Sequence, residues 1–400
     1  MARTTTPRGD RTGGARLTAE QRRRQLAEAA ARRFHRHGFH AVALADVAAD
    51  VGVTAPAVYR HFRNKKALLA GAIESGLDLA DADLLVAGES LDHLLLALAG
   101  AALDRRDMWV LVQREMRHLD GEEFAAVKAR FNGFVARFSE RLHAARPDAD
   151  PGQLALLVTA VFAVLTSPSI SRVRMPEAAY RRLLTAAAAA TARAELPAPA
   201  PAPDSQVPTR VDRRSVPVSR SEELLETAVE LFHDRGYAAV SLDDIGAAVG
   251  MAGPSIYHHF ETKSELLVTA VTRVARRLTA ARPYDDGAGA PDILQELVRS
   301  YIRVGVEQRH LFGVYVTEAI SLPPDARRRI DTELAASVRE WSAALRSRRP
   351  ELSAAQSQAL VYAARAIVND VVRVGQLHTR PRTEPELQVL LGTVLDTELP

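Results

Sequence analysis

The chain contains one stretch of sequence twice, and this repeat constrains its fold more than any other feature. Phe34-His-Arg-His-Gly-Phe39 resembles Phe232-His-Asp-Arg-Gly-Tyr237, and 53–62 resembles 251–260 in the same way. A repeat of this kind predicts two copies of one folding unit. Identical residues recur 198 positions apart without a gap: Gly38 and Gly236, Gly52 and Gly250, Pro56 and Pro254, Tyr59 and Tyr257, His61 and His259, Phe62 and Phe260, Lys65 and Lys263, Leu68 and Leu266.

The repeat continues more faintly at an offset of 203, where Trp109 matches Phe312 and Phe138 matches Trp341. The change of offset falls in the loop 281–290, which has turn residues and no apolar period. The whole unit is therefore duplicated. The expected parts are a basic disordered arm (1–17), two small heads (18–65 and 220–263), two larger bodies (66–195 and 264–400) and a linker (196–219).

The linker is rich in alanine and proline. Alternating Ala-Pro cannot form a helix, because each proline removes a donor and forces its predecessor out of the helical region. At ~3.1 Å per residue such a segment reaches roughly 75 Å. That length suits a chain that must travel along a whole domain before it starts the second copy.

Composition favours helix and excludes several classes of protein. Apolar residues make up 47% of the chain and aromatic residues 5%, and alanine and leucine dominate the apolar set; both favour helices. We therefore expect an all-α fold. The chain has no cysteine, its histidines lack metal-ligand spacing, and no HExxH, GxSxG or P-loop motif occurs, so no metal, cofactor or catalytic residue is predicted. We find no signal peptide or membrane span and expect a cytoplasmic protein.

Each head shows the pattern of a helix-turn-helix. In the first, Thr18-Ala-Glu-Gln21 has the form of a capping box and opens a helix to about His37. A short helix follows from Leu44 to Val51, Gly52 makes a tight turn, and a second short helix is predicted over 54–62. The second head repeats this over 241–250 and 252–260, with Ser241 a better N-cap than Ala43.

These motifs resemble the TetR/AcrR family of bacterial regulators, in a tandem duplication. The resemblance implies that helices 54–62 and 252–260 enter the major groove of operator DNA, and that tyrosine, histidine and lysine side chains contact phosphates. The DNA-binding residues so implied in the first head are Thr54, Ala55, Pro56, Ala57, Tyr59, Arg60, His61 and Lys65. Those in the second head are Gly253, Pro254, Ser255, Tyr257, His258, His259 and Lys263.

Other roles are open for some of these residues. Phe62 and Phe260 are expected in the core, and Tyr59 and Tyr257 fit either the core or a phosphate contact. A lone Lys65 would be a solvated lysine, but its recurrence as Lys263 favours function. The arginine-rich arm fits plain disorder or a contact along phosphates. Of the polar groups near the bases, Arg60 and His258 are the best candidates for discrimination.

The bodies are expected to be helical, with one helix over Leu84–Ala99. In the family the last two long helices of each subunit form a four-helix interface; here they would be 152–166 with 176–194 and 353–376 with 384–397. Covalent linkage raises the effective concentration of one half for the other, which favours an intramolecular pseudo-dimer. Dimers of the whole chain are an alternative.

The family resemblance implies a repressor that responds to a small, apolar or acyl molecule, although an activator is also compatible with the sequence. Because the two base-facing surfaces differ, we expect an operator with two non-identical half-sites. The alternatives are an architectural DNA-binding protein without a ligand and, least favoured, an enzyme. The alternative for the candidate ligand residues is a set of surface pairs at helical spacing. These candidates are Arg114, Glu115, His118, Tyr315 and Glu318.

Overall fold

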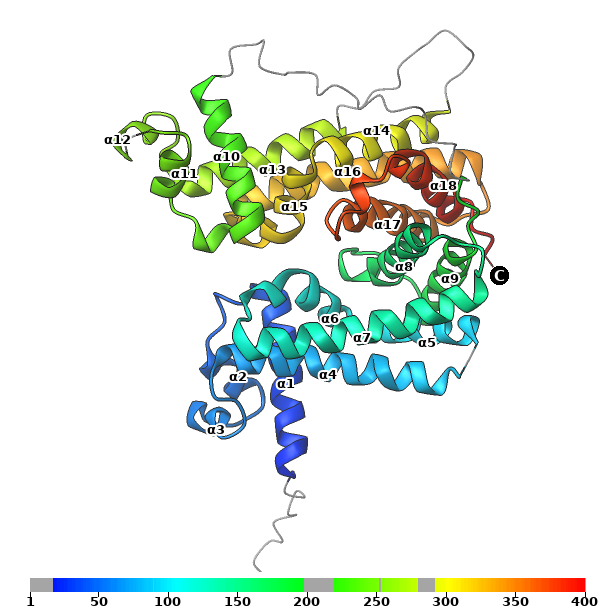
Figure 1. Ribbon diagram of the computed structural model, residues 1–400, viewed down its shortest axis with the longest axis horizontal. Helices are drawn as coiled ribbons and strands as arrows, with labels where there is room; N and C mark the ends of the chain where they lie inside the picture. Colours follow the sequence, from blue (N-terminus) through cyan, green and yellow to red (C-terminus); the bar gives the residue numbers. More distant parts are fainter. Residues whose placement is uncertain (1–16, 89, 198–218, 252, 280–291, 400) are drawn as a thin grey trace, which may run out of the picture.

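A computed structural model describes residues 17–88, 90–197, 219–251, 253–279 and 292–399, and within these ranges every regular element is a helix (Figure 1). The all-α fold predicted from composition is confirmed. The basic arm, most of the linker and the loop 281–290 lie outside the described residues.

The first unit begins with a three-helix head and continues through a long fourth helix into its body. After α6 the chain passes through one π-helical turn (111–115) and one 3-10 turn (116–118) before the longest helix of the unit starts. The helices are α1 (Ala19–His37), α2 (Leu44–Asp50), α3 (Ala55–Tyr59), α4 (Lys65–Val86), α5 (Leu91–Asp104), α6 (Arg106–Val110), α7 (Gly121–Ala145), α8 (Pro151–Thr166) and α9 (Glu177–Ala192).

The second unit repeats this order helix for helix. Its longest helix has 25 residues, as does its counterpart α7, and the two start 203 positions apart. The helices are α10 (Arg220–Arg235), α11 (Leu242–Ala248), α12 (Gly253–Ile256), α13 (Lys263–Thr279), α14 (Ile293–Glu307), α15 (Arg309–Glu318), α16 (Pro324–Arg348), α17 (Ala354–Val371) and α18 (Thr383–Leu395).

A repeated side-chain contact shows that the register of 203 holds to the end of each body. The Arg146 guanidinium donates to the carbonyls of Ala192 and Ala194, at 3.1 and 2.9 Å. Arg349 does the same to Leu395 and Thr397, at 2.9 and 2.8 Å. In each unit the arginine after the longest helix thus satisfies carbonyls that the last helix leaves without helical partners.

The two units pack against each other through their last two helices. α8 packs on α17 and α9 packs on α18, while α8 also contacts α9 and α17 contacts α18. Figure 1 shows these four helices together at one end of the molecule and the two heads at the other. The segment Pro151–Ser169 is apolar and long enough to cross a membrane, but 61% of its window is buried; its composition is that of a core helix.

Three expected helices differ from the prediction: one is divided in two, and two end early. The helix expected over Leu84–Ala99 is two helices, because the chain turns at Gly88 (φ 58°) and Ser90 then caps α5 by accepting the N–H of His93 at 3.3 Å. The helices expected over 54–62 and 252–260 end at Tyr59 and at Ile256. In the first head the chain leaves the helix because Phe62, 2% exposed, must turn into the core.

Candidate nucleic-acid interface

The helix-turn-helix of the first head is built on a turn that requires glycine. Gly52 lies between α2 and α3 with φ 68°, a conformation that strains any residue with a Cβ. The next amide, of Val53, donates back to the carbonyl of Ala48 at 3.0 Å. Val47 and Val58, both fully buried, fix the two helices to the core of the head. The second short helix is thus held by its inner face, which leaves its outer face free.

The second head has the same turn at the equivalent position. Gly250 has φ 69°, and the N–H of Met251 donates to the carbonyl of Gly246 at 2.8 Å. Ile245 and Ile256 are fully buried, as their counterparts are in the first head. The repeat found in the sequence is therefore a repeat of backbone conformation.

The residues expected to face DNA lie mostly on the outside of these helices. Tyr59 is 58% exposed and Tyr257 is 51% exposed, so neither is a core residue. Thr54, Pro56 and Arg60 are exposed as well, whereas Ala55, Ala57 and His61 are half-buried. In the second head Ser255 and His258 are exposed and His259 is half-buried, with its Nδ1 3.1 Å from the hydroxyl of Ser221.

The two recurring lysines have partners inside their own heads. The ammonium of Lys65 donates to the carbonyl of His40 at 3.2 Å and lies 4.6 Å from the centre of the Phe39 ring. Lys263 donates to the carbonyls of Tyr237 and Val240, both at 2.7 Å. Burial lowers the pKa of both lysines. Their recurrence therefore has a structural reason that sequence reasoning missed, and their contact with phosphate stays a prediction.

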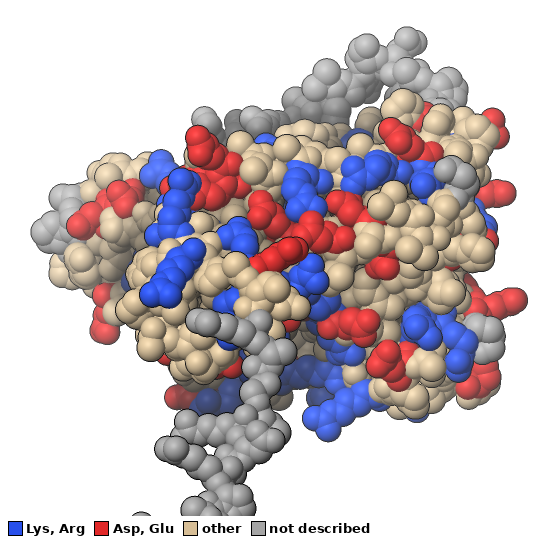
Figure 2. All heavy atoms as spheres, turned by 90° about the horizontal axis from the view of Figure 1, so that it is seen from below, with Lys and Arg blue, Asp and Glu red and all other residues tan. Residues whose placement is uncertain are grey.

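Charged residues around the two heads differ. In the first head Arg63, 64% exposed along its side chain, pairs with Glu123, and Arg23 lies 4.3 Å from the centre of the Phe62 ring. The equivalent positions of the second head hold Glu261 and Ser221. Over the face shown in Figure 2, acidic and basic side chains are intermingled. Charge does not mark a binding surface on that face, whereas the geometry of the two heads does distinguish them.

A buried glutamate joins each head to its body. α1 ends at Gly38 (φ 78°), and the next amide, of Phe39, donates to the carboxylate of Glu115 at 3.0 Å. In the second unit the amide of Tyr237 donates to Glu318 at 3.2 Å. Both carboxylates are at most 2% exposed, so the alternative that Glu115 belongs to a set of surface pairs is wrong.

The two glutamates take their cations from different units. Glu115 pairs with Arg114 of its own unit, and Arg114 also donates to the carbonyls of Phe34 and His35 at the end of α1. Glu318 pairs instead with Arg117 of the first unit. A further hydrogen bond crosses between the units where Gln113 donates to the carboxylate of Asp370 at 3.1 Å.

A cavity of about 420 Å³ lies between the two junctions and is lined by residues of both units. Four of the five candidate ligand residues, Arg114, Glu115, His118 and Glu318, are among its lining. Burial, reinforced by Arg117 and His40, lowers the pKa of His118 to about 3, so its ring is neutral near pH 7. Tyr315 is not in that lining; it packs within the second body, where burial raises the pKa of its phenol.

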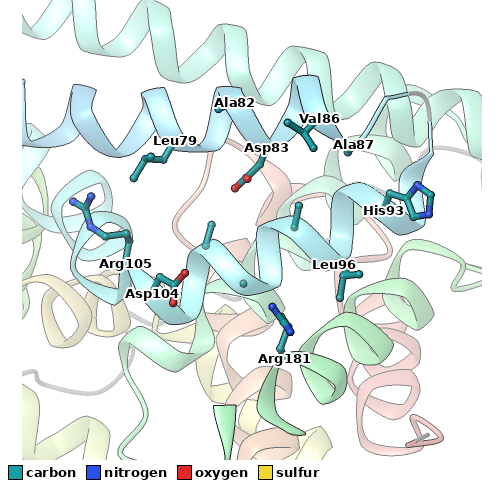
Figure 3. A pocket seen from close by; sticks show the side chains of 13 residues that line it. Leu79, Ala82, Asp83, Val86, Ala87, His93, Leu96, Asp104, Arg105 and Arg181 are labelled. Carbon is teal, nitrogen blue, oxygen red and sulfur yellow. The ribbon is translucent and has the colours of Figure 1, made fainter. Parts of the chain in front are cut away.

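A second hollow, of about 640 Å³, opens on the first body between α4 and α5 (Figure 3). Apolar side chains such as Leu79 and Leu96 line it, and Asp83 and Asp104 supply acidic groups. Burial, and then the neighbouring Asp104, raises the pKa of Asp83. The lining of this hollow includes none of the five candidate residues.

Comparisons with known proteins agree with the geometry of the heads. The family of bacterial regulatory proteins named tetR matches residues 26–72 and again residues 224–270. The transcriptional repressor KstR2 of Mycolicibacterium smegmatis is 41% identical over 56 residues, which are 14% of this chain and 27% of that protein. The transcriptional activator FasR of the same organism is 38% identical over 69 residues, which are 16% of this chain and 32% of that protein.

Solved structures with a similar fold include KstR2 of Mycobacterium tuberculosis, with 23% identity and a TM-score of 0.36 over 44% of this chain and 93% of that one. The regulator PfmR of Thermus thermophilus has 23% identity and a TM-score of 0.38 over 43% of this chain and 96% of that one.

Two segments of the chain, one in each head, thus match the tetR family of bacterial regulatory proteins, at residues 26–72 and 224–270. The family and these relatives are transcription regulators, not enzymes. The chain spans between 24% and 38% of the length of the curated relatives it matches.

Proposed function

We propose that this chain is a ligand-responsive transcriptional repressor that binds its operator as a single molecule, with α3 in one half-site and α12 in the other. The observation that carries the proposal is the placement of both heads at one end of the molecule, opposite the four-helix contact (Figure 1). A homodimer obtains such a pair of heads by symmetry, whereas this chain contains both. It would act in the cytoplasm, and the four-helix contact would serve as an intramolecular dimer interface.

The operator we propose has unequal half-sites. The base-facing residues differ between Thr54-Ala-Pro-Ala57 and Ala252-Gly-Pro-Ser255, and Arg60 is replaced by His258. Small residues such as these offer contact to a thymine methyl, while Arg60 and Ser255 offer hydrogen bonds to base edges. Phosphate contacts are assigned to Tyr59, His61, Lys65 and their counterparts Tyr257, His259 and Lys263. The half-site centres should lie about 34–36 Å apart.

The response to a ligand would act through the two junctions. A ligand shifts binding only if it favours one separation of the heads over the other. Arg114, Glu115, His118 and Glu318 surround the cavity between the heads, where a change in separation alters their contacts. We assign these four residues to the coupling of ligand and DNA binding.

The experiment is footprinting on the DNA upstream of the gene, with the mass of the complex measured in parallel. We expect one chain per operator. Two perfect palindromes, each built from one half-site, are then compared with the natural operator, and each should bind more weakly. Affinity for both palindromes equal to that for the natural operator, or two chains on each operator, would contradict the proposal. An architectural protein would show no change in operator affinity with any small molecule.

A further inference from the structure

The interiors of the two bodies are built at equivalent positions from different chemistry. In the first body four aromatic rings fill the space between α6, α7 and α8. Ring centres of Trp109 and Phe162 lie 5.6 Å apart, those of Phe134 and Phe162 5.7 Å, and those of Phe138 and Phe162 4.7 Å. Phe134 and Phe138 are fully buried. This interior is a packed aromatic core.

In the second body two of these four rings are replaced by polar residues. At the register of 203, Arg365 stands where the first body has Phe162, and Ser337 stands where it has Phe134. Phe312 and Trp341 keep the other two aromatic positions. A serine is far smaller than a phenylalanine, and the rings of Phe312 and Trp341 pack instead against Tyr301, with ring centres 5.6 and 5.7 Å apart.

The guanidinium of Arg365 is buried without an acidic partner. Arg365 is 6% exposed and its Nη1 has no hydrogen-bond partner among the described residues, nor has the hydroxyl of Ser337, which is 1% exposed. The contact of Arg365 is with the face of Tyr301, 4.6 Å from the ring centre. The Tyr301 hydroxyl donates in turn to Asn369 at 2.8 Å.

Acidic side chains nearby have other positions or partners. Asp331 pairs with Arg172 of the first unit at 3.1 Å. Glu333 on α16 has an unpartnered carboxylate oxygen, but it occupies the position of Arg130, which pairs with Asp78 and Asp81 on α4. Glu333 lies one helical turn before Ser337 on α16, and no ion pair joins it to Arg365 among the described residues.

A charged guanidinium does not lose its proton in proteins, and its burial without a counter-ion is costly. A cation–π contact offsets only part of that cost. The planar fork of an arginine matches a carboxylate with two parallel hydrogen bonds. The surrounding rings of Tyr301, Phe312 and Trp341 offer an apolar lining, and a single arginine suits one negative charge better than the two of a phosphate.

We propose that the second body alone contains the ligand site of this chain, and that it binds an apolar molecule bearing one carboxylate, held by Arg365 between Tyr301 and Ser337. The proposal deepens the ligand response proposed above and rests on it. In the first body the equivalent positions are occupied by the rings of Phe162 and Phe134, which pack together.

The two tryptophans of the chain allow a direct test, because Trp109 lies in the first body and Trp341 in the second. The variant Trp109→Phe leaves Trp341 as the sole tryptophan, and phenylalanine is the residue at the equivalent position, Phe312. The probe is decanoate, titrated into the full chain without DNA, with decanol as the uncharged match. We expect a saturable change in Trp341 emission, with decanol at least about tenfold weaker.

The same titration is made in the Trp109→Phe background with Arg365→Met, and with Arg339→Met as a control at an exposed arginine of α16. Arg365→Met should abolish the preference for decanoate and raise the melting temperature of the free protein, while the control changes neither. If Arg365→Met does not fold, Arg365→Lys keeps the charge without the fork and should weaken decanoate binding.

Absence of a saturable signal at millimolar decanoate, equal binding of decanol, or a preference that survives substitution of Arg365 would overturn the proposal. Gel shifts on the operator distinguish failure of the proposed ligand site from failure of the proposed function. Loss of carboxylate binding with intact operator binding defeats the ligand site alone, whereas carboxylate binding without operator binding defeats the repressor.

Discussion

The two units of this chain share a backbone and differ in what they place on it. The first has a head with Arg63 beside its helix-turn-helix and a body filled with aromatic rings. The second has Glu261 at the equivalent position of its head and a buried arginine in its body. In a homodimer one sequence must serve both DNA binding and ligand binding in every subunit. Under the function and ligand site proposed above, the duplication lets the first unit contribute more to DNA affinity and the second to sensing.

The largest expected effect concerns the two junctions. Glu115→Ala leaves the Phe39 amide without its acceptor and the mostly buried Arg114 without its carboxylate partner, and should lower the free energy of unfolding by about 3–5 kcal/mol. Glu318→Ala should cost less, because its partner Arg117 has a side chain 29% exposed and can reach water. Urea unfolding of both variants measures this difference. Equal losses would mean that the junctions are energetically alike.

Acid should affect the first junction through His118. Its pKa is lowered to about 3 in the folded protein and lies near 6.5 in the unfolded chain. The unfolded state therefore binds the extra proton between these values, so stability is full above pH 6.5 and falls as the pH drops toward 3.

His118→Phe keeps the stacking on Phe39 and removes the titration. It should reduce the slope of the unfolding free energy against pH by up to about 1.4 kcal/mol per pH unit. The second unit has Ser321 at this position. Burial also lowers the pKa values of His35 and His233, so part of the slope should remain; an unchanged slope would place the acid sensitivity elsewhere.

Reversing charge beside the heads should shift DNA affinity in opposite directions. Arg63→Glu should weaken operator binding about tenfold, and Glu261→Arg should strengthen it and make the plot of log affinity against log salt steeper by roughly one. Arg193→Glu, at the end of α9, is the matched control and should change neither. Fluorescence anisotropy at several salt concentrations gives both quantities, and equal effects of all three would remove the distinction between the heads.

The smallest expected effect separates the heads by their helix caps. Ser241 accepts the N–H of Asp244 at 3.0 Å at the start of α11, whereas Ala43 makes no side-chain cap at the start of α2. Ser241→Ala should cost about 1 kcal/mol, and Ala43→Ser should gain up to a similar amount. Calorimetry checks both; a loss on Ala43→Ser would show that the two caps are not equivalent.

The sequence predicted the parts of the structure that depend on local pattern. The repeat of Gly52 and Gly250 located both turns, and the register of 203 matches the starts of α15, α16 and α17 to those of α6, α7 and α8. The sequence did not predict features that depend on contacts between residues outside the local pattern. The length of α3 depends on where Phe62 enters the core, and the role of Lys65 depends on the carbonyl of His40.

The buried chemistry was the hardest part to predict. The sequence offers Glu115 and Glu318 as candidate ligand residues, but their role as acceptors needs the backbone of a head about 80 residues away. Nothing in the sequence of the second unit alone marks Arg365, because the long side chain of an arginine on an apolar helix can extend to the surface. The comparison with Phe162 in the other copy was the signal that could have found it.

The junctions also cross between the units. Arg117 of the first body lies over Gly236 of the second head, at 3.7 Å from the position a Cβ would take, and Ile320 of the second body lies over Gly38 of the first, at 3.6 Å. In a symmetric pair of subunits one substitution would change both of these contacts between units at once. Within a single gene each can change alone, and here one contact involves an arginine paired with Glu318 while the other involves the apolar side chain of Ile320.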